Sequence, residues 1–317
     1  MPAPTSLTIV IVNWNVRALL AACLTSLAAD PACGDWDVVV VDNASDDGST
    51  AMVRTDFPWV RLIESPVNLG FADGCQAGWD ASDSAFVLLL NPDTEVPVGA
   101  LGGMLADLSA RPTAAILGSR LAAADGRLQR SAGGAFPTLR NIAWNYLFLD
   151  RLLPRRWAPP AVFIECDPDD VRVMDWVSGA AMLLRRAAVG PRIFDPEYFM
   201  FGEDMALCDR MRRQGCQVLY SGRQTVLHHH GQSYQKQSSI EVLVTIYRGP
   251  RTFFRATHGA GAAVAYDALL FVGYFLRWMI ASTLNLLRPG RGYDEMARFS
   301  RNFVGIILRS ALSRQPP

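Results

Sequence analysis

A run of five apolar residues, Phe86–Leu90, ends abruptly at the polar residues Asn91, Pro92 and Asp93. A short continuous apolar run is typical of a strand that is buried on both faces of a sheet. Ligands of open α/β sheets bind beyond the carboxyl ends of the strands. Asp93 is therefore expected where a metal ion or a phosphorylated substrate would lie, although Asn, Pro and Asp are also common in ordinary turns.

The same succession of apolar strand, polar loop and helix recurs before this point. Strands are predicted at residues 7–12, 37–41, 60–64 and 86–90, and helices at residues 16–28, from about residue 49, and up to residue 79. This alternation implies a doubly wound α/β fold, with a mostly parallel sheet and right-handed crossovers. A chain of 317 residues with 50% hydrophobic content is long enough to bury such a core.

Three of these strands are followed by side chains suited to a nucleotide. Trp14 follows the first strand, Asp42 and Asn43 follow the second, and Asp93 follows the fourth. In a nucleoside diphosphate, a flat aromatic ring can stack on the base, and an acidic acceptor can bind the base or the ribose. A carboxylate can hold the metal ion that neutralises the diphosphate. The loop after the first strand lacks the G-x-G-x-x-G pattern of dinucleotide-binding folds, which argues against a nicotinamide or flavin enzyme.

Three glycines, at positions 70, 74 and 78, line the predicted third helix. They would permit close approach of the backbone to a ligand, aided by N–H groups of the helix N-terminus, or simply close packing of the helix on a strand. Residues 113–175 show a possible strand at 114–121, a turn at 125–126 and an aromatic-rich helix at 141–153, but no chemical motif. Their place between two site segments makes them a candidate acceptor-binding insert.

Residues 173–184 again show a clear pattern, a strand-like apolar run interrupted by Trp176 and Gly179. Trp176 can be a core residue or a platform for a ligand. Glu203 and Asp204 begin a predicted helix at residues 205–214, where acidic residues commonly complement the helix dipole. Because adjacent helical residues point about 100° apart, only one of the two can face a given site.

A predicted strand at residues 225–230, after another at 216–220, contains three consecutive histidines. In an extended segment His228 and His230 share one face and His229 points away. At most two of the three can therefore reach one metal ion.

The charge of the chain is divided unevenly. Residues 1–235 contain 19 arginines, no lysine and 26 acidic residues, whereas residues 236–317 contain 11 basic and four acidic residues. The tail is apolar at residues 264–287, but Asp267 and Arg277 interrupt this stretch, and the uncharged run between them, residues 268–276, is too short to span a bilayer. We expect helices that lie on an anionic membrane surface, with a packed appendage or a homodimer contact as the alternatives.

The six cysteines have no C-x-x-C spacing, and no hydrophobic leader precedes the first strand. These features favour reduced thiols and a cytoplasmic protein associated peripherally with the membrane.

A series of short segments, taken together, resembles the family 2 glycosyltransferases of the GT-A fold, and among them the bacterial rhamnosyltransferase-like branch. The segments occur in the expected order at residues 11–15, 40–49, 68–72, 89–94, 175–180, 201–210 and 226–231. The resemblance implies a catalytic domain at residues 1–235 and a helical C-terminal region at residues 236–317. The catalytic domain would comprise a nucleotide-sugar half (1–120) and an acceptor half (121–235).

The resemblance also implies roles for individual residues. Asp93 would be the metal-binding carboxylate of an Asp-x-Asp-like motif whose first position is Asn91, and His228, or else His230, would be a second metal ligand. Asp204 would be the catalytic base, although the acidic residue usual two positions later is Ala206. Substrate contacts are then expected from the following residues: Val12, Trp14, Asp42, Asn43, Asn68, Gly70, Asn91, Trp176, Gly179 and Glu203.

The implied activity is inverting transfer of a sugar from a nucleoside-diphosphate donor to a hydroxyl of a glycan or polyprenyl-linked acceptor in cell-envelope polysaccharide synthesis. dTDP-rhamnose is the favoured donor. Because residues 1–235 carry a net negative charge, Mn²⁺ or Mg²⁺ is expected to neutralise the leaving diphosphate, and a histidine ligand favours Mn²⁺. The alternatives are a UDP-galactofuranose-type transferase, a glycoside hydrolase using Asp93 with Glu203 or Asp204, and a non-catalytic nucleotide-sugar-binding subunit. No nucleic-acid partner is expected.

Overall fold

The computed structural model describes residues 7–164, 169–229, 240–289 and 291–312. The chain divides into two compact units. Unit 1 consists of Met1–Phe136 and Phe163–Lys236, and unit 2 of Pro137–Val162 and Gln237–Pro317. Residues 137–162, which the sequence suggested as part of the acceptor half of the catalytic domain, thus group with the C-terminal helices.

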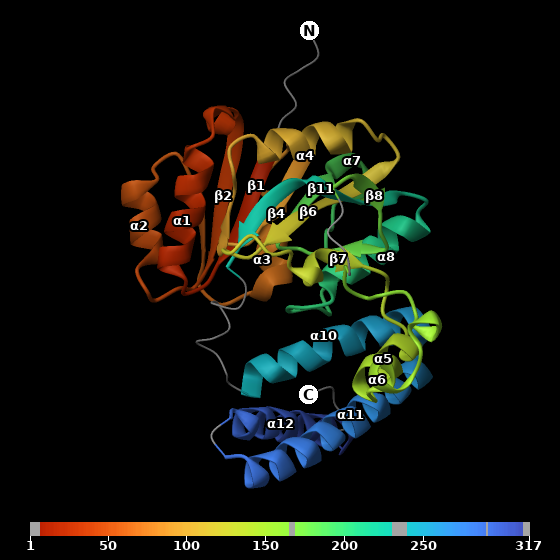
Figure 1. The fold of residues 1–317 in the computed structure, drawn as a ribbon. Helices are drawn as coiled ribbons and strands as arrows, with labels where there is room; N and C mark the ends of the chain where they lie inside the picture. Colours follow the sequence, from red (N-terminus) through yellow and green to blue (C-terminus); the bar gives the residue numbers. More distant parts are fainter. Residues whose placement is uncertain (1–6, 165–168, 230–239, 290, 313–317) are drawn as a thin grey trace. The chain divides into compact units, whose positions relative to one another are not determined.

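Unit 1 is built on one mixed sheet covered by helices (Figure 1). The described part of this sheet has nine strands, in the order β3 (Arg61–Ser65), β2 (Trp36–Asn43), β1 (Leu7–Asn13), β4 (Phe86–Leu90), β10 (Ala181–Arg185), β6 (Ala114–Ala122), β11 (Gln217–His228) and β5 (Thr94–Glu95), with β8 (Val171–Val173) pairing with β11. The four predicted strands β1 to β4 form and pair in parallel, as expected. In the other half, three strands pair antiparallel: β10 lies between β4 and β6, and β5 and β8 pair with β11.

Strand β11 differs from the prediction, because the two strands expected at 216–220 and 225–230 form one continuous strand. Its register against β6 shifts between Ser221 and Thr225, which explains why the sequence there reads as a break. A small second sheet pairs β7 (Gly133–Gly134) with β9 (Trp176–Val177). The run at 173–184 is therefore divided among β8, β9 and β10.

Four helices of unit 1 form where the sequence predicts them: α1 (Arg17–Ala28), α2 (Ser49–Asp56), α3 (Gly70–Asp80) and α8 (Glu203–Arg213). Two further helices, α4 (Ala100–Ser109) and α7 (Arg186–Val189), were not predicted. Helix α3 packs tightly on β1, because a Cβ at Gly74 or Gly78 would lie within 2.8 Å of the side chain of Val12 or Val10. Gly74 and Gly78 therefore allow the helix to pack closely on the strand, which is one of the two interpretations that the sequence left open.

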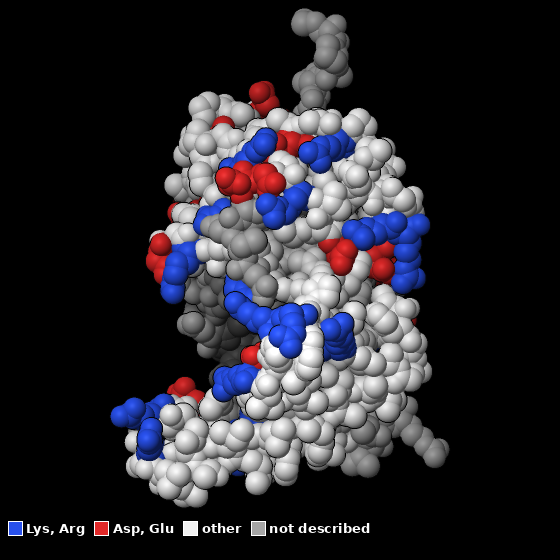
Figure 2. Space-filling view, turned by 45° about the vertical axis from the view of Figure 1, so that its right-hand side comes forward, with Lys and Arg blue, Asp and Glu red and all other residues white. Residues whose placement is uncertain are grey.

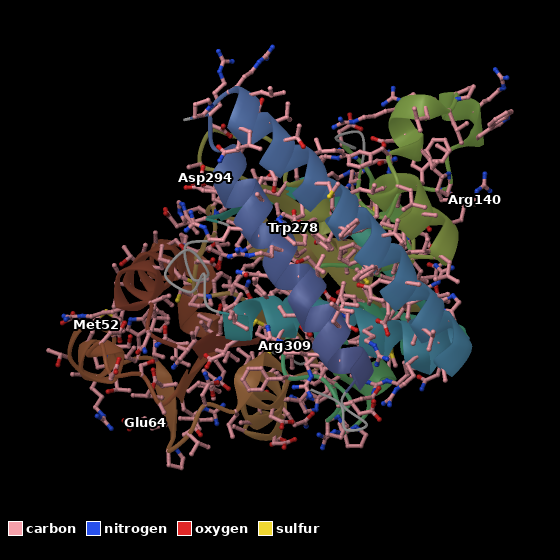
Figure 3. All side chains as sticks on the ribbon, turned by 90° about the horizontal axis from the view of Figure 1, so that it is seen from below. Met52, Glu64, Arg140, Trp278, Asp294 and Arg309 are labelled. Carbon is pink, nitrogen blue, oxygen red and sulfur yellow. The ribbon has the colours of Figure 1, made fainter. Side chains whose placement is uncertain are left out.

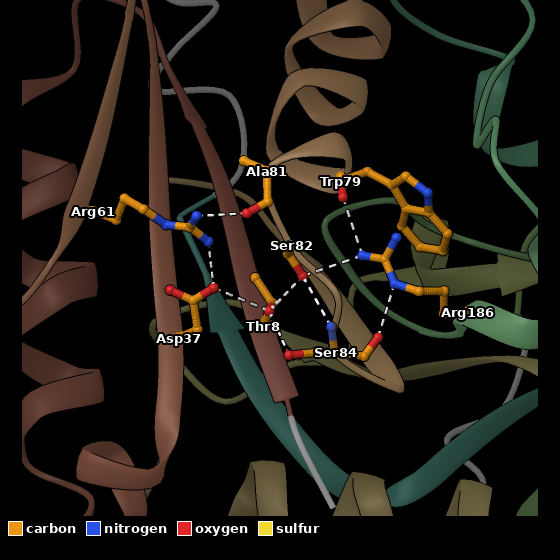
Figure 4. Close-up of polar contacts among 8 residues, drawn as sticks. All are labelled: Thr8, Asp37, Arg61, Trp79, Ala81, Ser82, Ser84 and Arg186. Carbon is orange, nitrogen blue, oxygen red and sulfur yellow. Dashed lines mark hydrogen bonds and ion pairs between the residues drawn. The ribbon is translucent and has the colours of Figure 1, made fainter.

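A polar network ties the beginnings of β1 and β2 to the loop between α3 and β4 and to α7 (Figure 4). Thr8 Oγ1 lies 2.7 Å from Ser82 Oγ and donates to Ser84 Oγ. The Arg186 guanidinium lies 4.0 Å from the Trp79 ring and donates to the carbonyls of Ser84 and Trp79. Because this network lies where β1 and β4 begin, it leaves the opposite, carboxyl edge of the sheet for a ligand.

Unit 2 is helical. Its elements are α5 (Leu139–Tyr146), α6 (Leu149–Leu152), α10 (Ile240–His258), α11 (Ala260–Leu287) and α12 (Tyr293–Leu312). The single helix predicted at 141–153 is broken at Phe148, which has a left-handed φ of 57°. Aromatic rings fill the core of unit 2, with Tyr274 stacked on Phe303 at 4.4 Å and Phe254 on Tyr266 at 4.7 Å. Figure 3 shows α11 and α12 side by side, with Trp278 on α11 and with Asp294 and Arg309 on α12.

The two charged residues of α11 are paired inside unit 2. Asp267 accepts hydrogen bonds from Tyr247 at 2.8 Å and from Arg251 at 2.9 Å, and both donors lie on α10. Arg277 donates to the carbonyls of Asn145 and Tyr146 at the end of α5. By length and composition α11 could cross a membrane, and it is the one helix in the described part of the chain that could. The sequence argued against a membrane span because Asp267 and Arg277 interrupt the apolar stretch. It could not show that both charges have partners within unit 2.

Candidate active site

The short strand β5 brings the polar loop after β4 to the end of β11. His228 pairs in register with Thr94, and Leu227 with Glu95. His228 Nε2 consequently lies 3.2 Å from Asp93 Oδ1, and the backbone N–H of His229 donates to the Asp93 carbonyl at 2.8 Å. The side chain of His229 points elsewhere and pairs with Glu95 at 2.6 Å. The structure thus brings Asp93 and His228 together, while His230 lies outside the described residues.

The pair formed by Asp93 and His228 is buried and has polar neighbours. Asp93 is 4% exposed and His228 is 6% exposed. Asn91 Nδ2 lies 3.5 Å from His228 Nε2, and Gln129 Oε1 lies 2.8 Å from His228 Nδ1. No motif pointed to Gln129, because it follows the turn at residues 125–126 and reaches His228 only through the pairing of β6 with β11.

This donor set fits a divalent cation. A carboxylate oxygen and an imidazole nitrogen that face each other are a common pair of ligands for Mn²⁺ and related metals, and a carboxylate suits Mg²⁺. Among the described residues no group of three or more His, Cys, Asp or Glu side chains could hold a metal. In that part of the chain the pair is thus an incomplete ligand set, and oxygens of a diphosphate could complete it.

Asp204 lies at the start of α8, after Gly202, whose left-handed φ of 84° begins the helix. Its carboxylate accepts hydrogen bonds from the backbone N–H of Met205 at 2.8 Å and of Gly179 at 3.4 Å. Burial raises the pKa of Asp204 to about 6, although these two N–H groups act in the opposite direction. A carboxylate with this pKa is ionised at neutral pH and is more basic than an exposed one.

A short connection links Asp204 to the loop that carries Asp93. Gly179, which donates to Asp204, precedes Ala180, and the Ala180 carbonyl accepts a hydrogen bond from the backbone N–H of Asn91 at 2.9 Å. Asn91 in turn lies beside His228. The predicted base and the predicted metal ligands therefore belong to neighbouring segments at the carboxyl edge of the sheet.

Glu203, the other carboxylate of the helix start, is buried more deeply than Asp204. Burial, and then the neighbouring charge of Asp204, raise the pKa of Glu203 well above its ordinary value. Its Oε2 has no hydrogen-bond partner among the described residues. The two acids therefore differ in their surroundings, and Asp204 is the partly exposed one.

Trp14 and Asp42, the predicted nucleoside contacts, lie after β1 and near the end of β2. The Trp14 side chain is 37% exposed, whereas Asp42 is 2% exposed and accepts hydrogen bonds from Asn13 Nδ2 and the Ser45 N–H, both at 2.8 Å. Val12, at the end of β1, is buried beneath α3. The Oδ1 atoms of Asn13 and Asn43 are buried and have no hydrogen-bond partner in the described part of the chain, so they could accept hydrogen bonds from a base. The sequence reading did not include Asn13, because an amide within a strand carries no special signal.

Asn68 and Gly70 have clear local roles. Asn68 Oδ1 accepts a hydrogen bond from the Gly70 N–H at 2.8 Å, and this turn starts α3. Gly70 has a φ of 78°, and a Cβ there would lie 2.6 Å from the Phe199 ring. The Phe71 N–H donates to the Phe199 carbonyl at 2.9 Å, so this turn supports the segment that leads to Asp204.

Trp176 is a core residue in this structure. Its side chain is 3% exposed, its Nε1–H donates to the Ala135 carbonyl at 3.1 Å, and its ring packs edge-on against Phe163. The ring is therefore buried, and its one polar atom already has a hydrogen-bond partner. This supports the core interpretation of Trp176 rather than a platform for a ligand.

Comparison with known proteins places the chain in a family. Residues 8–171 match the model of glycosyl transferase family 2. The chain is 31% identical over 209 residues to an N-acetylglucosaminyl-diphospho-decaprenol L-rhamnosyltransferase of Mycobacterium tuberculosis. The aligned region covers 62% of this chain and 67% of that protein.

Two solved structures share the fold. A mannosyltransferase from Pyrobaculum calidifontis, in complex with GDP-Man and Mn²⁺, matches with a TM-score of 0.54 at 15% identity, and the match covers 98% of this chain and 88% of that chain. TarS from S. aureus matches with a TM-score of 0.50 at 13% identity, and the match covers 98% of this chain and 93% of that chain. The mixed sheet with its carboxyl-edge site is therefore the GT-A fold, and the chain belongs to glycosyl transferase family 2.

Proposed function

We propose that this glycosyltransferase moves an L-rhamnosyl group from a nucleoside-diphosphate donor to a hydroxyl of a lipid-linked glycan. The observation that carries the proposal is the meeting of Asp93 with His228 beside the segment that holds Asp204. The choice of rhamnose and of a lipid-linked acceptor is supported by the name of the mycobacterial relative.

Asp93 and His228 are the residues that would hold Mn²⁺ or Mg²⁺. Unit 1 contains 16 basic and 25 acidic residues, so its own charge does not favour a leaving diphosphate. A divalent cation supplies that positive charge when it is bound. On the nucleoside side, the exposed Trp14 ring offers a stacking surface, and the buried oxygens of Asp42, Asn13 and Asn43 offer acceptors.

Asp204 is proposed as the general base. Its raised pKa makes the carboxylate a better proton acceptor, while the N–H groups of Gly179 and Met205 hold its orientation. A base that takes the proton of the acceptor hydroxyl as this hydroxyl attacks the anomeric carbon gives a single displacement with inversion. No covalent sugar–enzyme intermediate is then needed.

The test is a transfer assay with a panel of nucleotide sugars, Mn²⁺, and a water-soluble N-acetylglucosaminyl-diphospho-lipid analogue of short chain. We expect release of nucleoside diphosphate that depends on the acceptor and is strongest with dTDP-rhamnose. Release from UDP-galactofuranose alone would assign another donor. Binding of nucleotide sugar without any release would leave only a binding subunit. A chelator-insensitive hydrolysis of simple glycosides would support a glycoside hydrolase.

We also propose that unit 2 binds an anionic membrane surface. All exposed residues of α11 are uncharged, and they recur at helical spacing: Ala260, Gly261, Val264, Ala268, Val272, Phe275, Leu276, Met279, Ile280, Thr283, Leu286 and Leu287. Unit 2 also carries 14 arginines and five acidic residues. Figure 2 shows blue Lys and Arg side chains in separate groups on a surface that is mostly white. An apolar helix face in a unit with an excess of basic side chains is suited to binding anionic lipid.

Vesicle sedimentation distinguishes the modes of binding. We expect the protein to sediment with vesicles containing anionic lipid and to be released by high salt. Release only by detergent would show that α11 inserts into the bilayer. Absence of binding together with a dimer in solution would show that the apolar face of α11 is a protein interface.

A further inference from the structure

Gln129 makes two hydrogen bonds to one residue, His228. Its side-chain Nε2 donates to the backbone carbonyl of His228, and its Oε1 lies 2.8 Å from His228 Nδ1. Gln129 is itself held in place, because its N–H donates to the Leu121 carbonyl at the end of β6 at 2.8 Å. Gln129 lies after the turn that follows β6, and because the end of β6 pairs with β11, this bond to Leu121 holds Gln129 beside the end of β11. The two hydrogen bonds from Gln129 form a clamp on His228.

The chemistry of these groups determines which ring nitrogen carries the proton. A backbone carbonyl can only accept, so the amide NH₂ of Gln129 must face it. The amide oxygen must then face Nδ1 of His228, and because this oxygen can only accept, Nδ1 must carry a hydrogen. In a neutral imidazole the other nitrogen, Nε2, is then an acceptor, and Asn91 Nδ2 lies 3.5 Å from it.

The lone pair of Nε2 points towards a second acceptor. Nε2 lies 3.2 Å from the carboxylate oxygen Oδ1 of Asp93, and both residues are buried. Two buried acceptors that face each other repel unless a positive charge, either a metal ion or a second ring proton on the histidine, lies between them. The clamp therefore presents the nitrogen that a metal ion needs, on the side where the carboxylate already lies.

We propose that Gln129 is a positioning residue that fixes the tautomer and the ring orientation of His228 for metal binding. The inference rests on the proposed metal site and adds a residue to it. Outer-shell partners of this kind typically change metal affinity by about 10–100-fold when they are removed. Gln129 itself does not contact the cation.

The first experiment reads the tautomer without any metal. The full chain is labelled with ¹⁵N-histidine, and the ring nitrogens are observed by NMR at pH 8, with the His228→Asn variant used to assign the signal among the four histidines. We expect His228 to carry its proton on Nδ1. In the Gln129→Met variant, which keeps the volume but removes both hydrogen bonds, we expect a mixture of tautomers. In the Gln129→Glu variant, which keeps an acceptor for Nδ1, the wild-type tautomer should return.

The second experiment measures the affinity for Mn²⁺ by electron paramagnetic resonance, with MnCl₂ alone and with MnCl₂ plus dTDP. We expect Gln129→Met to weaken Mn²⁺ binding by about 10–100-fold and Gln129→Glu to restore most of it. The matched control is Arg127→Ala, which alters the same turn at an exposed residue whose side chain pairs only with Asp125 in the described contacts. Its affinity should equal that of the wild type.

The outcomes separate this inference from the proposed function. A wild-type His228 protonated on Nε2, or a Gln129→Met variant with unchanged tautomer and unchanged Mn²⁺ affinity, would overturn the role of Gln129. If the wild-type protein shows the Nδ1 proton but binds no Mn²⁺ with dTDP present, the proposed metal site is wrong while the clamp on the histidine stands.

Discussion

A carboxylate withdrawn from water is a stronger base than an exposed one, because burial disfavours its charged form. Asp204 is in this position, and two backbone N–H groups keep it oriented. Replacing Asp204 with Asn retains the shape and removes the proton acceptor. We expect turnover to fall by at least about 10²-fold, and up to about 10⁴-fold, while donor affinity stays unchanged. Steady-state rates combined with calorimetric titration of dTDP would check both parts. A variant with near wild-type turnover would contradict the role of Asp204.

The same shift in pKa predicts how the stability of the protein depends on pH. Because the pKa of Asp204 is raised from 3.8 to about 6 in the folded state, the folded protein binds this proton more tightly than the unfolded chain. The stabilising effect is full below pH 4 and is lost as the pH rises through 6. At pH 8 we therefore expect Asp204→Asn to be more stable than the wild type by roughly 1–3 kcal/mol.

This comparison needs urea unfolding of both proteins at pH 8 and near pH 4. The advantage of the Asn variant should shrink or reverse at the lower pH. An equal difference in the free energy of unfolding at both pH values would show that Asp204 is not the titrating group.

At the scale of elements, the packing of α3 on β1 allows a sharp test. A Cβ at Gly78 would lie 2.3 Å from Val10 Cγ1, so Gly78→Ala should destabilise the protein by about 1–3 kcal/mol through overpacking. Gly102, inside α4, is the matched control, because no atom lies within 4 Å of its added Cβ. Gly102→Ala should stabilise by about 0.5–1 kcal/mol. Denaturant titration of the two variants measures the difference. If both variants shifted stability in the same direction, the close packing of α3 would not be what requires glycine at position 78.

The elements that could be predicted from the sequence are those with local causes. The apolar runs of β1 to β4 and the turn residues after them required no knowledge of distant segments, and the edge that gathers Asp42 and Asp93 followed from them. The antiparallel return of β5 onto β11 depends on pairing between residues more than 130 positions apart in the chain. Gln129 and Asn13 were missed for the same reason, since their partners are known only once the sheet is assembled. The break at Phe148 is a left-handed backbone that no residue type there requires.

At the scale of the whole molecule, the chain combines a body rich in acidic residues with a second unit rich in arginines. A lipid-linked acceptor would make this division useful, because binding to the membrane concentrates the enzyme where its acceptor lies. The apolar face of α11 exposes large side chains, while its two charged residues, Asp267 and Arg277, are paired within unit 2. Packing within unit 2 therefore does not explain why the exposed side chains of α11 are apolar.

The proposed membrane surface predicts a separation of lipid binding from catalysis. Met279 is 54% exposed on α11, so Met279→Glu places a charge on the apolar face without disturbing the core. We expect binding to anionic vesicles to fall by at least about 10-fold, because a buried carboxylate is costly at a lipid interface. Turnover on a water-soluble acceptor should stay unchanged. Val98→Glu, at a 63% exposed position in unit 1, is the matched control and should leave vesicle binding unaffected. Equal binding by all three proteins would show that α11 does not contact lipid, and an equal loss in both variants would reflect added negative charge alone.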